Sequence, residues 1–135
     1  MTADRIGSLL ARAHGVVRHR MTAALEGSGL HLGHVAILSL LADGVGRTQK
    51  TLSAETGIEK SSMVLFLDML EKEGWVERRP HPADRRAYLV TLTGEGARRL
   101  GEVGPRLGLA QKEAFSMLSG EELAQLGATL RKLIG

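Results

Sequence analysis

The most informative part of this 135-residue chain reads Trp75-Val-Glu-Arg-Arg-Pro-His-Pro-Ala-Asp-Arg-Arg-Ala-Tyr-Leu-Val-Thr-Leu92. Here the period of the pattern changes from the 3.6 of a helix to 2, which predicts two antiparallel strands, Trp75–Arg79 and Ala87–Leu92. The segment between them, Pro80–Arg86, has seven residues and two prolines, which is long for a simple hairpin. We therefore expect a β-ribbon with an extended loop at its tip.

Two helices are expected directly before this ribbon. Thr48 is suited to cap a short helix that ends at Gly57. A longer helix is expected over Lys60–Glu73, with an inward apolar face made by Met63, Phe66, Leu67 and Leu70. A short helix, a glycine-containing turn and a longer helix form a helix-turn-helix, and the ribbon makes it a winged helix.

Positive charge is concentrated in the ribbon. The nine residues from Arg78 to Arg86 include four arginines and one acid, Asp84, which gives a net charge of +3. The formal net charge of the whole chain is also +3, so this short stretch matches it alone. A local cationic loop points to a polyanionic partner, nucleic acid first, and a solvated loop is the alternative. A position at the root and tip of a wing favours the polyanion.

Long amphipathic helices are expected on both sides of the winged helix. Apolar residues recur at steps of three and four over about Asp4–Leu25, whereas Leu32–Ala42 is apolar nearly all round and should be central and buried. A helix over about Gly94–Met117 contains Pro105, which should kink or divide it. The capping-box sequence Ser119–Glu122 opens a terminal helix. The expected fold class is mainly α, with a small two-stranded β wing.

We expect one domain, residues 1–135, with the winged helix-turn-helix lobe at residues 31–93. The apolar stripes of the flanking segments, residues 1–30 and 94–135, are more than a lobe of that size can cover. They are expected to be dimerisation helices, because homodimers are the commonest oligomers; the alternative is that they fold back on their own domain. The expected interface residues are Ile6, Leu9, Leu10, Ala13, Leu123, Leu126, Leu130 and Leu133.

Three segments of the chain resemble the MarR family of bacterial transcription regulators. Glu77–Thr93 is similar to the family's wing signature, which ends in Asp-Arg-Arg and Leu-Thr. Gly57-Ile-Glu-Lys-Ser-Ser62 and Asp68-Met-Leu-Glu-Lys-Glu-Gly74 are similar to its recognition helix and the exit from that helix. The resemblance implies a homodimer with a DNA-binding lobe in each subunit, placed on a pseudo-palindromic duplex. It also implies a repressor whose DNA binding is relieved by a small ligand.

The resemblance assigns roles in DNA binding to individual residues. Arg86 matches the wing arginine that enters the minor groove, where narrow A·T tracts concentrate negative potential. Asp84 matches the acid that holds this guanidinium in place, and forming the loop turn is the alternative role. Contacts to phosphates, which set affinity and register, are expected from Arg78, Arg79 and Arg85. The two helix starts are expected to supply Thr48, Gln49 and Lys50 to phosphates, and Lys60, Ser61 and Ser62 to base edges.

The recognition helix departs from the family pattern on its outward face. Family members frequently carry polar residues there, whereas this chain has Val64, Leu65 and Met69. One interpretation is apolar readout of thymine methyl groups in the major groove. The others are packing on a neighbouring helix or plain exposure, and an apolar patch for a protein partner.

Several classes of function are excluded or disfavoured. The absence of cysteine excludes disulfides, thiolate metal sites and a thiol redox switch. We expect no enzyme and no cofactor, because neither a phosphate-binding glycine loop nor a hydrolase or metalloprotease motif occurs. His31 and His34 stand three residues apart, but without further ligands we assign no metal. No apolar run is long enough to span a membrane, and no signal-peptide pattern occurs, so we expect a cytoplasmic protein.

The expected partners are double-stranded DNA, a second copy of the chain and a small aromatic or anionic effector. The effector-binding residues are unknown, although cationic side chains of the first helix could line a pocket. The alternative to a regulator with sharp sequence readout is one with weak readout, or a winged-helix module for protein contact. The dependence of binding on salt discriminates DNA binding from protein contact, because binding through several cations weakens steeply with salt and apolar contact does not.

Overall fold

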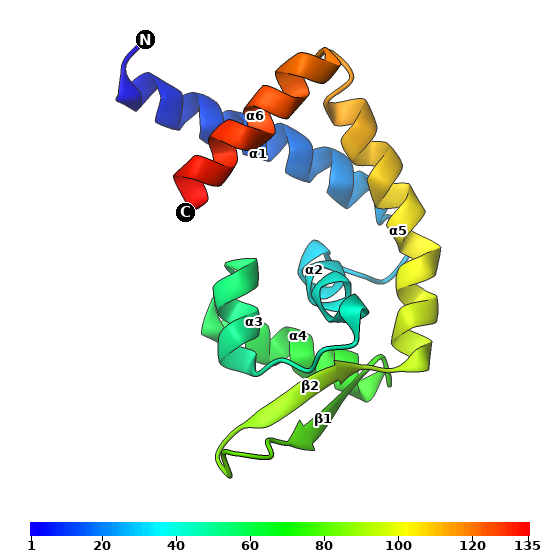
Figure 1. The fold of residues 1–135 in the computed structure, drawn as a ribbon. Coiled ribbons are helices and arrows are strands. Elements are labelled where there is room, and N and C mark those ends of the chain that lie inside the picture. The colour runs from blue at the N-terminus through cyan, green and yellow to red at the C-terminus, as the bar shows by residue number, and fades with distance from the viewer. The chain divides into compact units, whose positions relative to one another are not determined.

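The computed structural model describes residues 1–135 and consists of six α-helices, a short 3-10 helix and a two-stranded sheet (Figure 1). This confirms the expected fold class. In chain order, the elements are α1 (Ala3–Ala24), α2 (Leu32–Leu40), η1 (Leu41–Asp43), α3 (Gln49–Thr56), α4 (Lys60–Lys72), β1 (Val76–Pro80), β2 (Tyr88–Leu92), α5 (Gly94–Ala114) and α6 (Gly120–Ile134).

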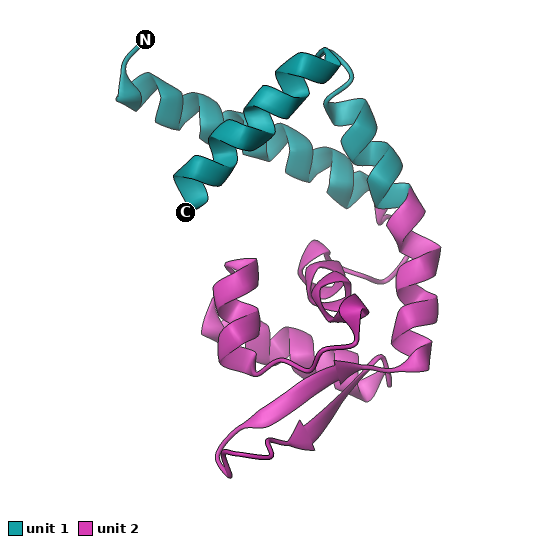
Figure 2. Cartoon of the chain, in the orientation of Figure 1, with its two compact units in different colours: residues 1–24, 106–135 teal, residues 25–105 magenta.

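The chain divides into two compact units, coloured separately in Figure 2. The winged-helix unit is Leu25–Pro105. The helical unit consists of Met1–Ala24 and Arg106–Gly135, and therefore contains α1, the end of α5 and α6. No helix of either unit is both long and apolar enough to cross a membrane.

The core of the winged-helix unit is built around α2. A helix that is apolar on nearly every side can be covered only from several directions, and α2 is in contact with α3, α4 and η1. This confirms the expected central position. The buried cluster consists of Ile37, Leu38, Leu41, Leu52, Met63, Leu67, Leu70, Val76 and Val90.

Local capping sets the ends of the two helices of the helix-turn-helix. The Thr48 hydroxyl accepts a hydrogen bond from the Thr51 N–H at 3.1 Å and starts α3. Gly57 ends α3 in the left-handed conformation with φ of 74°, and Gly74 follows α4 with φ of 78°. Both φ values favour glycine, so these two residues fix where the helices stop.

The two strands form the expected antiparallel ribbon, in register from Val76 opposite Leu92 to Pro80 opposite Tyr88. Both strands begin one residue later than the sequence predicts. A third segment pairs with the ribbon: the Arg47 N–H donates to the Val90 carbonyl at 3.0 Å, and the Val90 N–H donates to the Arg47 carbonyl at 2.8 Å. This pairing ties the residue before the α3 cap directly to the wing.

The two C-terminal helices differ from the sequence prediction at Pro105 of α5 and agree with it at the start of α6. Helix α5 runs without interruption through Pro105, so the expectation that this proline divides it is wrong. The predicted capping box is confirmed, because Ser119 accepts from the Glu122 N–H at 3.1 Å and its own N–H donates to the Glu122 carboxylate at 3.0 Å. Neither α1 nor α6 contains a buried residue.

Candidate nucleic-acid interface

Helix α4 presents a mixed outer face of polar and apolar side chains. Lys60 and Ser61 are exposed and Ser62 is half-buried at its start. Further along, Leu65 is 70% exposed and Val64 38%. Met69 differs from expectation, because it is half-buried and packs against the core instead of pointing outward. Two apolar side chains are therefore available on this face.

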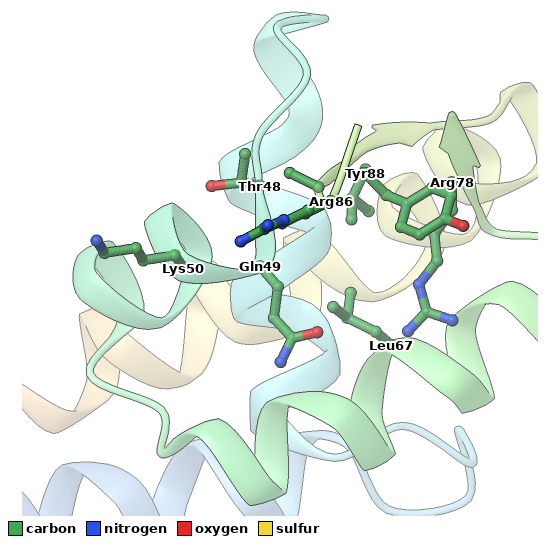
Figure 3. Close-up of a pocket in the computed structure, with 9 residues that line it drawn as sticks. Thr48, Gln49, Lys50, Leu67, Arg78, Arg86 and Tyr88 are labelled. Atoms are coloured by element: carbon green, nitrogen blue, oxygen red, sulfur yellow. The ribbon is translucent and has the colours of Figure 1, made fainter. Parts of the chain in front are cut away.

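A cavity of about 340 Å³ lies between the start of α3, helix α4 and the wing. Figure 3 shows the side chains converging on it from these elements. This space brings together residues that the sequence assigned separately to α3 and to the wing. It is lined by Thr48, Gln49, Lys50, Leu67, Arg78, Arg86, Ala87, Tyr88 and Val90. Tyr88, which is 58% exposed, was not singled out as a site residue; the sequence signal was its place in the strand expected over Ala87–Leu92, next to the wing loop.

The four arginines of the wing have different surroundings. Arg78 donates to Asp68 at 3.1 Å and to Glu71 at 3.2 Å, so its charge is engaged by two carboxylates of α4. This geometry holds β1 against α4, and the phosphate contact expected of Arg78 from the sequence stays a prediction. Arg79 forms an ion pair with Glu77 at 3.2 Å. Surface pairs of this kind are weak and can exchange for another anion.

Arg85 and Arg86 are exposed, and their guanidinium groups form none of the ion pairs found in the structure. Asp84 accepts a hydrogen bond from the backbone N–H of Arg86 at 2.9 Å. The acid therefore shapes the turn, which is the alternative role given above, and does not hold the Arg86 guanidinium here. His81 acts similarly, accepting from the Ala83 N–H at 3.0 Å. Two local turns thus shape a loop whose two free cations face solvent.

Arg47 anchors α3 to the wing and was not singled out in the sequence. Its guanidinium donates to Asp43 at 2.8 and 2.9 Å and to the Leu40 carbonyl at 2.7 Å, and it lies 3.4 Å from Glu55. Hydrogen bonding from Arg47 lowers the pKa of Asp43 to about 2, with help from the Val45 N–H. Because the Arg47 backbone pairs with β2, these contacts position the start of α3 against the ribbon. The sequence held no clear signal for this pair, because the i, i+4 rule applies within a helix and Asp43 and Arg47 are separated by a turn.

Two histidines cap α2 where it meets the recognition helix. The His31 Nδ1 accepts from the Gly33 N–H at 2.9 Å, and the His34 Nδ1 accepts from the His31 N–H at 2.9 Å. The Phe66 ring of α4 lies 5.2 Å from the His31 ring and 4.8 Å from the His34 ring, measured between centroids. Gly33 lies so close to Phe66 that a side chain there would clash. The pair acts as a capping box, which is the capping role that stands as an alternative to a metal site for these histidines.

The capping role predicts that acid weakens the fold. Burial, together with the nearby His31, lowers the pKa of His34 below its usual 6.5. Folding therefore favours the neutral imidazole, and this contribution to stability is complete above pH 6.5. It is lost as the pH falls from 6.5 through the lower folded pKa, because the unfolded chain binds the proton first. Thermal melting across this range should show the decline.

The matched control is His34→Gln, because glutamine at this third helical position can still accept from the capping residue and does not titrate. We expect its melting temperature to fall less steeply between neutral and mildly acid pH than that of the wild type. Equal slopes for the two proteins would contradict a role for His34 in the acid response.

The fold and this surface define a class of protein, a winged helix-turn-helix with a basic wing. The family model described as "MarR family" matches residues 28–87. A crystal structure of a MarR-family transcriptional regulator from Rhodococcus sp. RHA1 is 30% identical, covers 99% of this chain and 95% of its own, and has a TM-score of 0.89. The chain belongs to the MarR family.

Two further relatives are informative. CouR from Rhodococcus jostii RHA1, solved with p-coumaroyl-CoA, is 28% identical, with 96% of this chain and 91% of its own covered and a TM-score of 0.84. Transcriptional repressor MprA from Escherichia coli K12 is 37% identical over 83 residues, which are 62% of this chain and 47% of MprA. The matches span between 47% and 63% of the length of the first curated relatives.

Proposed function

We propose that this chain is a transcription regulator that binds double-stranded DNA as a homodimer at a pseudo-palindromic operator. The observation that carries the proposal is the pair of unpaired cations, Arg85 and Arg86, on a wing that shares one cavity with the start of α3. Helix α4 would enter the major groove, and the wing would enter the flanking minor groove. The DNA-binding lobe is residues 31–93.

The proposed dimer rests on the exposed apolar side chains of α1 and α6. Ile6, Leu9 and Leu10 are between 39% and 50% exposed, Leu123 is 43% exposed and Leu133 69%. Exposed apolar stripes of this extent mark a surface that binds a partner. A second copy of the chain related by two-fold symmetry presents the same stripes and can cover them. Residues 1–30 and 94–135 are the proposed dimerisation segments. Two-fold symmetry also places the recognition helices about 34 Å apart, one turn of DNA.

We further propose that the protein is a cytoplasmic repressor relieved by a small aromatic or anionic molecule. The similarity to repressor MprA and to CouR, solved with an acyl-CoA ligand, supports this regulation. The helical unit offers a surface cavity of about 450 Å³ whose lining includes His19, Arg20 and Arg106. Arg20 and Arg106 beside the apolar Leu109 suit an anion with an aromatic body, and Glu113 in the same lining suits a hydrogen-bond donor on that ligand.

The test of the proposed function is fluorescence anisotropy with a duplex taken from the DNA upstream of the protein's own coding region. At two salt concentrations, we expect saturable binding of one dimer per duplex that weakens with salt and exceeds binding to a scrambled duplex. Equal binding to the scrambled duplex would leave a cationic surface without sequence readout. No binding at low salt would overturn the proposal in favour of a protein-interaction module.

Leu65 tests the apolar readout of the major groove. Because its side chain is 70% exposed, Leu65→Ala costs the fold little and removes the part that could touch a thymine methyl group. We expect operator affinity to fall about fivefold, roughly 1 kcal/mol, for the loss of a few buried methyl-sized groups, with little change on scrambled DNA. The measurement is anisotropy on both duplexes.

Replacing thymine by deoxyuracil, base by base, removes only the methyl group and locates the contact. At the contacted base, the substitution should weaken the wild type and leave Leu65→Ala unchanged, because the two changes remove the same interaction. Additive losses at every thymine would contradict direct readout by Leu65 and favour plain exposure of this side chain or a protein partner.

A further inference from the structure

Arg99 of α5 joins three parts of the winged-helix unit through one side chain. Its guanidinium carbon lies 5.3 Å from the centroid of the Trp75 ring, which places the cation over the aromatic face. The same group donates to the Ser28 carbonyl and forms an ion pair with Glu102 at 3.0 Å. The side chain is only 17% exposed, so these contacts are shielded from bulk water.

The Ser28 end of this connection is an ordered turn. Ser28 is buried, its hydroxyl donates to the Leu25 carbonyl at 2.5 Å, and it accepts from the Leu30 N–H at 3.1 Å. This turn joins the residue that follows α1 to the start of α2. The hydrogen bond from Arg99 to the Ser28 carbonyl is therefore made to the backbone of this turn and not to a mobile side chain.

The Trp75 end is fixed to the recognition helix. The Trp75 N–H donates to the Leu70 carbonyl of α4 at 2.9 Å, and the Trp75 carbonyl accepts from the Thr93 N–H at 3.1 Å. Gly96 of α5 packs so closely on this carbonyl that a side chain there would clash with it. The backbone of Trp75 is thus fixed to the end of α4 and to the start of α5.

We propose that Arg99 is a positioning residue for DNA binding, because it forms a tie between the turn after α1 and Trp75, which lies just beyond the recognition helix α4. The inference rests on the proposed function. Arginine suits this place because a planar guanidinium can stack on a ring while several N–H groups along its edge donate to a carbonyl and a carboxylate, whereas a lysine ammonium is a compact charge that cannot stack in this way. Specific base contacts need a recognition helix in one orientation, whereas phosphate contacts tolerate several. Loss of the tie should therefore reduce sequence preference more than DNA affinity in general.

The test compares Arg99→Met with Arg98→Met in the full chain. Arg98 is the adjacent residue, 58% exposed, and pairs only with Glu95 and Glu102 of its own helix, so its variant removes the same charge without the tie. We expect Arg99→Met to lower operator affinity about fivefold and scrambled-duplex affinity less than about twofold. The dependence on salt should be unchanged, because no phosphate contact is lost. Arg98→Met should keep the wild-type ratio of the two affinities.

Trp75 is the only tryptophan of the chain, so its fluorescence reports on the tie without DNA. We expect the emission to change in Arg99→Met and to remain as in the wild type in Arg98→Met. Arg99→Lys keeps the charge on a single ammonium group without the planar fork of donors, and should give an intermediate ratio of operator to scrambled affinity; it also serves if Arg99→Met does not fold.

Three results would overturn the proposal. A lower melting temperature with an unchanged affinity ratio would show that Arg99 is structural only. A shallower salt dependence would show that it contacts phosphate directly. Unchanged Trp75 emission would show that the tie is absent in solution. Failure of the wild type to bind any duplex would instead overturn the proposed function, and the emission comparison would still decide whether Arg99 holds Trp75.

Discussion

A glutamate in place of Leu9 should convert the dimer into monomers and lower operator affinity by about a hundredfold. Two-fold symmetry brings the substitution to the interface twice, and taking a carboxylate out of water there carries a desolvation cost that leucine does not have. DNA affinity falls when the dimer is lost. In a dimer, binding of one lobe to its half-site holds the second lobe at a high effective concentration near the other half-site, and a monomer lacks this gain. Size-exclusion chromatography with light scattering and anisotropy on the same samples measure both effects.

The matched control is Val45→Glu. Val45 is 58% exposed, against 46% for Leu9, and it belongs to the winged-helix unit. This variant adds the same charge at an exposed apolar residue outside the expected interface, and should remain dimeric. If Leu9→Glu kept the mass of the wild type, the helices would instead pack on their own chain. Melting curves check that both variants fold.

Arg86→Ala should weaken operator binding by at least about 1 kcal/mol and up to about 3 kcal/mol, the range of a good groove contact. The Arg86 side chain has no ion pair to give up, so its loss removes the DNA contact and leaves the fold unchanged. The loop turn survives because Asp84 accepts from the Arg86 backbone, not from its guanidinium. Anisotropy titrations give the change in affinity.

The duplex offers a second control for this residue. If Arg86 enters a narrow minor groove, replacing the flanking A·T pairs by G·C should weaken the wild type and have little effect on Arg86→Ala. Arg98→Ala, on the exposed side of α5, removes the same charge elsewhere and should bind as the wild type does. Unchanged operator affinity in Arg86→Ala would show that the wing is not engaged.

Helix ends that are set by residues close together in the sequence could be predicted from the sequence. The cap at Thr48, the left-handed Gly57 and the reciprocal bonds of Ser119 and Glu122 involve residues within a few positions of one another. Propensity and spacing carry enough information for such contacts. Pro105 is the exception among local signals, because α5 accommodates it within a continuous helix.

Contacts between distant segments could not be predicted in the same way. The ion pairs of Arg78 with Asp68 and Glu71 depend on how β1 lies against α4. Met69 points inward because the core extends to that side of α4. The contact of Arg99 with Ser28 joins residues 71 positions apart. The resemblance already gave Arg86 a role of its own among the wing arginines, but only the tertiary structure shows that Arg78 is paired with carboxylates of α4.

The absence of any buried residue in α1 and α6 has a consequence for how the protein responds to dilution. Helices with no fully buried residue and only a few half-buried ones gain limited free energy from their own chain, so we expect much of what orders them to come from the surface that covers them. If a second copy is that surface, order in these helices obeys mass action. At low abundance, monomers without a partner would then fray at these helices and become open to proteases, so that the lifetime of the protein would depend on its concentration.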